Sequence, residues 1–383
     1  MKIRSTVAYY ISYITIGFAT GIIGPTLQGL AGQTGAMLKG ISLVFPVLSV
    51  GYLIGSLTSG HIFDRIKGHP VIAGAIVLMA AAMALVPAVS LFWILMLLFF
   101  IIGLASSCVD VGGNALIIWV HRDKVAPFMV GLHFFFGFGA FFAPMVVGQT
   151  LKTAGGFEWS YWILAIICIP VALYFLLIRS PEQIKSSGKD QQGTIHIPLV
   201  ILITLFMFLH VGVELSFGGW IYSYAVKREL ATAPAAAYLT SAYWGALTAG
   251  RLVSVFVSMK LQTRSMLVLY LSGCILAVLL LLLGGASVPT AWAATILLGF
   301  SISALVPVTF TFAGENMPIT GQVTSWLVIG IGAGNMFFPW FVGQLFESAG
   351  PAVLPVTNLI TLFIALILIL YIFRYSRRGV KEL

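Results

Sequence analysis

Two carboxylates stand inside long apolar stretches of this 383-residue sequence, and they are the first candidates for chemistry. Asp110 and Glu214 are each flanked on both sides by more than ten predominantly apolar residues. If these stretches are membrane helices, a charged Asp near the helix centre costs roughly 2.5–3.5 kcal/mol on insertion scales. Residues that are this costly to bury usually serve a function, so both are candidate sites.

Polar neighbours of Asp110 recur at helical spacing. Ser106 and Asn114 lie four residues before and four residues after it, which places all three on one face of a helix. A carboxylate beside neutral oxygens suits a hard cation such as Na⁺, whereas a desolvated carboxylate could carry a proton instead. The alternative is a buried acid that only links helices. We predict a coupling-cation site at Asp110, Asn114 and Ser106, with Glu214 as a further member.

Glu214 is surrounded by residues that could hold a polar ring. His210 precedes it by one helical turn, and the Gly218–Gly219 pair that follows could unwind or kink the helix. Trp220 and Tyr222 come directly after the glycines. An aromatic face can cover the apolar side of a sugar while the carboxylate binds its hydroxyls. The competing interpretation is an aromatic belt at the membrane surface.

Four further polar residues within apolar stretches are predicted to contact a solute. His133 could bind the solute, relay protons or bond a backbone carbonyl. Gln28 and Asn335 are amides, which in membranes also link helices. Tyr243 could line a cavity or pack in the core. None of these residues forms a catalytic constellation, so we expect neither an enzyme nor a bound cofactor.

The composition indicates what positions these residues. Hydrophobic residues make up 60% of the chain, charged residues only 8%, and the mean hydropathy is +1.06. Such a chain lies mostly in lipid, where its backbone must pair internally. The apolar runs are continuous instead of alternating, so helices are predicted over barrel strands. The predicted spans are 6–30, 39–62, 70–88, 91–120, 126–152, 158–178, 197–225, 234–258, 264–285, 289–313, 320–346 and 351–374.

The net charge of +9 is explained better by basic residues in cytoplasmic loops than by binding to a nucleic acid. With both termini in the cytoplasm, sixteen of the twenty Lys and Arg residues fall on the inner side and four on the outer side. We therefore expect a multi-pass protein of the inner (cell) membrane, with the lipid bilayer as its partner and a monomer as its working form.

Internal repeats divide the chain in two. The pattern Gly139-x4-Pro144-x2-Val147-Gly148-Gln149 recurs 195 residues later from Gly334, and a shorter match pairs Gly55–Gly60 with Gly245–Gly250. Parallel repeats of this kind are typical of transporters. We predict a six-helix bundle over 1–178, a cytoplasmic linker over 179–196 and a second six-helix bundle over 197–383.

The loop after the second predicted span carries a recognisable pattern. It reads Gly60-x3-Asp64-Arg65-x-Lys67-Gly68-His69 and resembles the Gly-x3-Asp-Arg-x-Gly-Arg-Arg loop of the major facilitator superfamily, with one extra residue before the glycine and His69 in place of a basic residue. The resemblance implies twelve helices in two bundles and a conformational switch loop. We expect that loop to involve Gly60, Asp64 and Arg65, with Arg251 at the corresponding place in the repeat.

Three segments are similar to the fucose–proton symporter and sodium-dependent glucose transporter group. They are Gly24–Leu27, Asp110–Asn114 and Leu132–Ala140. The span-one aspartate and span-five asparagine of the fucose symporter have no counterpart here. The resemblance implies symport of a sugar or similar small polar solute with H⁺ or Na⁺ by alternating access. Two alternatives stay open: a proton-coupled drug exporter, because Gly139–Gly148 resembles an antiporter motif, and a non-transporting receptor.

Overall fold

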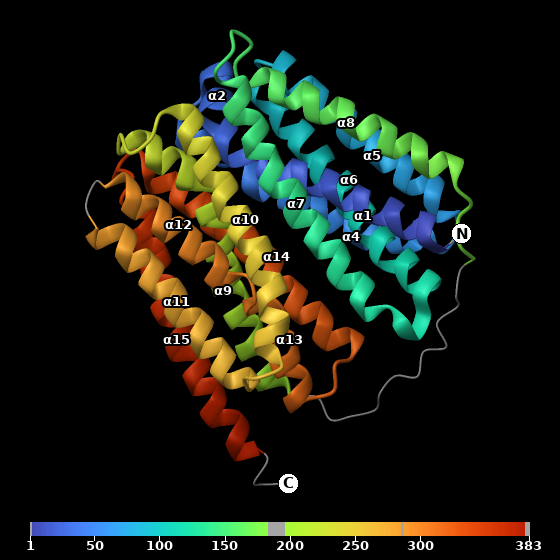
Figure 1. Ribbon diagram of the computed structural model, residues 1–383, viewed down its shortest axis with the longest axis vertical. Helices are drawn as coiled ribbons and strands as arrows, with labels where there is room; N and C mark the ends of the chain where they lie inside the picture. Colours follow the sequence, from blue (N-terminus) through green and yellow to red (C-terminus); the bar gives the residue numbers. More distant parts are fainter. Residues whose placement is uncertain (1, 183–195, 285–286, 380–383) are drawn as a thin grey trace. The chain divides into compact units, whose positions relative to one another are not determined.

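The computed structural model describes residues 2–182, 196–284 and 287–379, and within these ranges the chain is helical without a β-strand (Figure 1). Most of the predicted linker, residues 183–195, lies outside the described residues. The helices are α1 Lys2–Gly21, α2 Ile23–Thr34, α3 Leu38–Ile41, α4 Val44–Phe63, α5 Gly68–Leu85, α6 Phe92–His121, α7 Ala126–Thr150, α8 Glu158–Leu177, α9 Ile197–Lys227, α10 Ala233–Ser258, α11 Thr263–Leu283, α12 Val288–Ile302, α13 Leu305–Asn316, α14 Gly321–Phe346 and α15 Val353–Gly379, with 3₁₀ turns at Val86–Ala88 and Arg122–Lys124.

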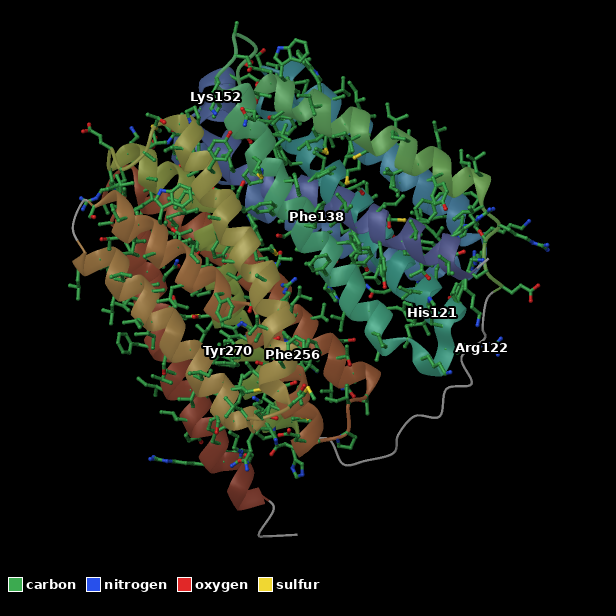
Figure 2. The ribbon with its side chains drawn as sticks, in the orientation of Figure 1. His121, Arg122, Phe138, Lys152, Phe256 and Tyr270 are labelled. Carbon is green, nitrogen blue, oxygen red and sulfur yellow. The ribbon has the colours of Figure 1, made fainter. Side chains whose placement is uncertain are left out.

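Most of these helices can cross a membrane. In the described ranges ten segments are long and apolar enough when α3 is counted with α4 and α12 with α13, and the bent pair α1 and α2 makes an eleventh. Large apolar side chains such as Phe256, which is 68% exposed, and Phe138 are exposed on the protein surface (Figure 2), as expected for a surface in lipid. The 26-residue α10, which contains Arg251, is less apolar. The helical membrane fold is confirmed, and α10 would supply the twelfth predicted span.

Prolines explain where two of the spans are broken. The α1 and α2 axes differ by 49°, and Pro25 cannot donate to the carbonyl of Gly21, the last residue of α1. In the same way Pro307 cannot donate to Ser303, which lies in the break between α12 and α13. The unwinding expected at Gly218–Gly219 does not occur, because α9 continues through both buried glycines. Glycine lowers helix stability by only about 1 kcal/mol.

The helices form two compact units. The first contains α1 to α8 and the part of α10 up to Gly245, and the second contains α9, the rest of α10 and α11 to α15. Corresponding helices pack alike in each unit: α1 against α7 and α9 against α14, and likewise α5 against α8 and α11 against α15. The predicted boundaries of two six-helix bundles stay a prediction.

The repeated glycines lie where two helices approach most closely. A Cβ on Gly139 of α7 would lie 2.2 Å from the carbonyl oxygen of Ile14 in α1. A Cβ on Gly334 of α14, 195 residues later, would lie 2.4 Å from the carbonyl oxygen of Phe208 in α9. Small residues permit such contacts between membrane helices. The repeat therefore encodes the same helix–helix contact in each unit.

The structure also sets the register of the shorter repeat. A Cβ on Gly55 would meet the hydroxyl of Ser107 at 2.1 Å, and a Cβ on Gly250 would meet the hydroxyl of Ser303 at 2.5 Å. The two glycines are 195 residues apart, like the other repeated positions. The sequence match had paired Gly55 with Gly245, which is five residues out of this register.

The glycine contacts lead to a stability prediction. Gly139→Ala should lower the free energy of unfolding by about 1–3 kcal/mol, because the added methyl group forces α1 and α7 apart. The measurement is the melting temperature of the purified protein in one detergent. Gly74→Ala in α5 is the matched control, since a Cβ there meets nothing within 4 Å. Equal melting temperatures for the two variants would contradict the proposed close contact.

Candidate functional site

The carboxylate of Asp110 lies where three helices of the first unit meet. The Tyr13 hydroxyl, from α1, donates to Oδ1 at 2.6 Å, and the Tyr52 hydroxyl, from α4, donates to Oδ2. Asn114, one turn along α6, donates its Nδ2 to Oδ1 at 3.0 Å. Hydrogen bonds to a carboxylate are stronger than those between neutral groups. The three donors therefore hold Asp110 firmly at the junction of α1, α4 and α6.

A glycine in α6 allows Tyr13 to reach the carboxylate. A Cβ on Gly113 would lie 2.5 Å from the ring of Tyr13, so only glycine leaves room for that ring. The ring is buried, with 1% of the residue's surface exposed. Burial of a tyrosine requires a partner for its hydroxyl, and Asp110 supplies that partner.

Sequence reasoning missed both tyrosines. Tyr13 and Tyr52 lie inside spans that are otherwise apolar, away from the ends where interfacial tyrosines gather. That position was the available signal, because a hydroxyl deep in a span must find a polar partner. The sequence could not show that both hydroxyls would reach the same carboxylate.

The structure does not bring Ser106 to Asp110. Its hydroxyl donates to the sulfur of Met79 in α5 at 3.3 Å, and the residue is 5% exposed. The reason is that α6 packs against α5 as well as against α1 and α4. Asp110 and Asn114 face α1 and α4, whereas Ser106 lies in the contact with α5.

His133 does approach the Asp110 site. It is an exposed residue of α7, and its ring lies edge-on to the ring of Tyr13, with the centroids 6.2 Å apart. Tyr13 therefore contacts both His133 and Asp110. The structure thus gathers three of the predicted residues, Asp110, Asn114 and His133, around one tyrosine.

The donor set around Asp110 fits a hard monovalent cation. An ionised carboxylate has about four lone-pair positions, and the three side-chain donors do not fill them all. The hydroxyl oxygens of Tyr13 and Tyr52 lie beside the carboxylate and are neutral oxygens of the kind that hard cations prefer. The same carboxylate can also accept a proton. The arrangement is chemically suited to either cation.

Glu214 forms an ion pair within the second unit. Its Oε1 lies 3.5 Å from Nη2 of Arg251, and the side chains are 8% and 21% exposed. Arg251 lies inside α10, which continues to Ser258, so it is not part of a loop. Its predicted place in a switch loop is therefore corrected. Whether Glu214 and Asp110 share one chamber stays a prediction.

The aromatic residues near Glu214 are packed in the core of the structure. Trp220 is fully buried, donates Nε1 to the carbonyl of Pro339 at 2.8 Å and stacks on Phe346. Its ring is occupied in the contact between α9 and α14, so it forms neither a belt nor an open sugar platform in this structure. Tyr222 and Tyr243 are also buried, at 4% and 0% exposure.

Two predicted amides present buried polar atoms without a protein partner. Within the described ranges Nε2 of Gln28, in α2, and Oδ1 of Asn335, in α14, are buried and accept or donate no hydrogen bond. Both ring nitrogens of His210, one turn before Glu214 on α9, are in the same state. Buried polar groups are rarely left unpaired. These buried atoms are therefore left unsatisfied by the described residues.

The predicted switch loop lies at the end of α4. Asp64 directly follows the last residue of the helix, its backbone N–H bonds the carbonyl of Gly60, and α5 begins only at Gly68. Asp64 therefore lies at the C-terminal end of α4, where the helix dipole does not favour a negative charge. Asp64 and Arg65 are both exposed.

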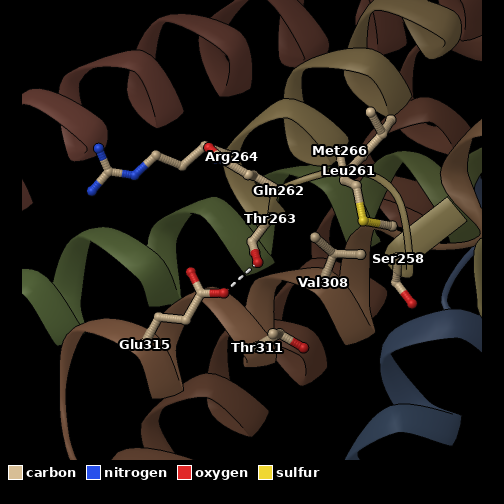
Figure 3. Close-up of a pocket in the computed structure, with 9 residues that line it drawn as sticks. All are labelled: Ser258, Leu261, Gln262, Thr263, Arg264, Met266, Val308, Thr311 and Glu315. Carbon is tan, nitrogen blue, oxygen red and sulfur yellow. Dashed lines mark hydrogen bonds between the residues drawn. The ribbon is translucent and has the colours of Figure 1, made fainter.

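Two open cavities are lined by none of the predicted site residues. The larger, about 630 Å³, lies between the start of α11 and the helix α13 (Figure 3). Glu315 and Thr263 are hydrogen-bonded across it, and Arg264 points away to donate to Ser376. The smaller, about 250 Å³, lies at the end of α8. The assignment of the site therefore rests on the contacts of Asp110 instead of on either cavity.

Comparison with known proteins gives the family. Residues 9–323 match the Major Facilitator Superfamily. The sodium-dependent glucose transporter 1A of Mus musculus is 28% identical, covering 88% of this chain and 88% of that protein. The human sodium-dependent glucose transporter 1 is 27% identical, covering 87% and 72%. The human major facilitator superfamily domain-containing protein 4A is 24% identical, covering 91% and 87%.

Solved structures share the fold. A mutant form of the nucleoside transporter NupG superposes with a TM-score of 0.77 at 13% identity and covers 97% of this chain and 99% of that one. A bacterial homologue of the human lysosomal transporter Spinster, in an inward-facing occupied conformation, gives 0.76 at 14% identity, covering 98% and 96%. The resemblance predicted from the loop at Gly60–His69 is confirmed, and this multi-pass chain belongs to the Major Facilitator Superfamily of membrane transporters.

Proposed function

We propose that this transporter couples the movement of a sugar or a similar small polar solute to that of a cation bound at Asp110. The observation that carries the proposal is the convergence of Tyr13, Tyr52 and Asn114 on one carboxylate inside the helix bundle. Three donors from three helices link the state of this carboxylate to the packing of α1, α4 and α6.

Na⁺ is the cation that we infer. The donor set consists of one carboxylate and neutral oxygens, which suits a hard cation. Two of the relatives described above are named as sodium-dependent glucose transporters. A proton is the competing cation, because the same carboxylate can carry it. If Na⁺ enters down its gradient and the solute moves with it, the transport is uptake by symport.

The solute is expected to contact polar atoms that the protein itself leaves unpaired. Gln28 Nε2 and Asn335 Oδ1 are such atoms, and they complement the hydroxyl groups of a sugar. His133 and Glu214 are proposed as further contacts. Tyr222, Tyr243 and Trp220 are buried here, so their part in binding requires a different conformation, which alternating access would supply.

Membrane orientation and the switch loop belong to the same proposal. We expect both termini in the cytoplasm, because sixteen of twenty basic residues then lie on the inner side. The exposed residues Asp64 and Arg65, together with Gly60 in the last turn of α4, would change partners during the transport cycle. The working unit is expected to be a monomer in the cell membrane.

The drug-exporter alternative loses its main support. The segment from Gly139 to Gly148 had suggested an antiporter motif, yet its first glycine packs against α1 in the same way as Gly334 packs against α9. A contact repeated in both units is a device for helix packing, and such a device does not indicate export.

Uptake into proteoliposomes tests the proposal. We expect radiolabelled hexose to accumulate above its external concentration under an inward Na⁺ gradient, and to do so less under a pH gradient of equal size. Liposomes without protein are the control. Accumulation driven only by the pH gradient would assign the site to a proton, and the absence of hexose movement under both gradients would overturn the proposed solute class.

A further inference from the structure

An open pocket with two arginines lies at one end of the first unit, where the chain enters α1 and leaves α8. It has a volume of about 250 Å³ and is lined by Arg4, Ser5, Leu177, Ile178 and Arg179. Arg4 is in the first turn of α1, and Arg179 is two residues beyond α8. Both are exposed, and neither makes an ion pair with a described residue. Two arginines therefore line the pocket without an ion-pair partner among the described residues.

The rim of the pocket is anchored to the bundle. Buried His69 holds the segment after α8 in two ways: its backbone N–H donates to the Ser180 hydroxyl at 2.9 Å, and its Nδ1 lies 3.1 Å from the carbonyl oxygen of Ile178. The Tyr9 hydroxyl contacts the other ring nitrogen of His69 at 2.9 Å. Because its backbone is fixed, the pocket does not have to form when a ligand arrives.

An apolar stripe on α8 leads directly to this pocket. Ile166, Leu173 and Leu177 are 63%, 55% and 82% exposed, and their spacing places them on one face of the helix. Ile3 and Val7 of α1 are exposed as well. In a membrane-spanning helix such a face lies against acyl chains. The pocket therefore lies at the end of a surface that we expect to face lipid.

We propose that this pocket binds the phosphate headgroup of an anionic phospholipid whose acyl chains lie along the exposed face of α8. Guanidinium groups bind phosphate through paired, charge-assisted hydrogen bonds. Anionic lipids are concentrated in the cytoplasmic leaflet, where the basic residues of this chain are expected to lie. The inference does not depend on which solute or cation is carried.

The test compares two lipids within each variant of the full-length protein. Melting temperatures are measured in nanodiscs of phosphatidylcholine alone and with one third phosphatidylglycerol. For the unmodified protein we expect phosphatidylglycerol to raise the melting temperature. In the R4Q/R179Q variant, at least half of this rise should be lost. The control R122Q/K124Q removes two exposed basic residues from the loop between α6 and α7 and should keep the full rise.

The design separates the proposal from its alternatives. Because each variant is compared with itself in two lipids, a general loss of stability in R4Q/R179Q does not obscure the result. An equal loss in both double variants would show only general attraction to a charged membrane and would overturn the pocket. An equal rise from soluble glycerol phosphate in phosphatidylcholine nanodiscs would also overturn the proposal, because a free phosphate would then be the ligand.

Discussion

Replacing Asp110 with asparagine is expected to abolish accumulation of solute against its gradient while leaving solute binding in place. Asparagine has the size of aspartate and can still accept a hydrogen bond from Tyr13 or Tyr52, so the junction of α1, α4 and α6 should persist. It cannot carry the negative charge that a cation requires. We expect the apparent affinity for Na⁺ to fall at least about tenfold, which corresponds to about 1.4 kcal/mol.

The measurement is hexose uptake into proteoliposomes under an imposed Na⁺ gradient, together with exchange of labelled for unlabelled hexose at equilibrium. Exchange requires binding and conformational change but no net driving force, so Asp110→Asn should retain it. Glu229→Gln is the matched control, because Glu229 is an exposed carboxylate in the turn after α9. Normal accumulation by Asp110→Asn would remove Asp110 from the coupling role.

Breaking the Glu214–Arg251 pair is expected to have the second large effect, on stability. Arg251→Met removes the cation that lies 3.5 Å from a carboxylate with only 8% exposure. Loss of one partner of a buried pair typically costs about 3–5 kcal/mol. Since Arg251 is itself 21% exposed, we expect the lower end of that range, seen as a lower melting temperature.

A double variant separates structure from transport. Glu214→Gln combined with Arg251→Met leaves no isolated charge and should recover most of the lost stability. If Glu214 also serves in coupling or solute binding, as proposed, uptake should not recover with it. Arg374→Met, which removes an exposed arginine of α15, is the control. Recovery of both stability and uptake would show that the pair is only structural.

The polar residues illustrate how far the sequence could be interpreted. Asp110 and Asn114 are one turn apart, and helix geometry alone predicted their contact, which the structure shows. The same geometry also placed Ser106 near Asp110, yet that hydroxyl bonds Met79. Spacing shows which residues share one face of a helix. Because such a face is wide enough to contact more than one neighbouring helix, the local sequence does not show which neighbour each residue meets.

The aromatic residues also show which features the sequence could predict and which contacts only the structure revealed. Trp220 and Tyr222 have the composition of a sugar site, but the ring of Trp220 is used in packing on Phe346. Tyr13 and Tyr52 drew no attention in the sequence, yet they complete the Asp110 site. In both cases the partner lies on another helix, far away in the chain.

The sequence by itself determined that the chain lies mostly in lipid, that it is helical and that its two halves repeat one another. Very few charged residues and long apolar runs require helices in lipid, since no water is present there to bond an open backbone. The 195-residue offset of the glycines indicated that the two halves of the chain repeat one another. These features follow from local composition and periodicity, which do not depend on which helices pack together.

Only the tertiary structure decided which polar groups meet. The structure joins residues distant in sequence in three places: α1, α4 and α6 meet at Asp110, Glu214 pairs with Arg251, and Arg4 of α1 lines one pocket with Arg179. The physical reason is that in lipid every helix is apolar on most faces. Close packing at glycines and a few polar contacts therefore select the partners, and both depend on the full three-dimensional arrangement.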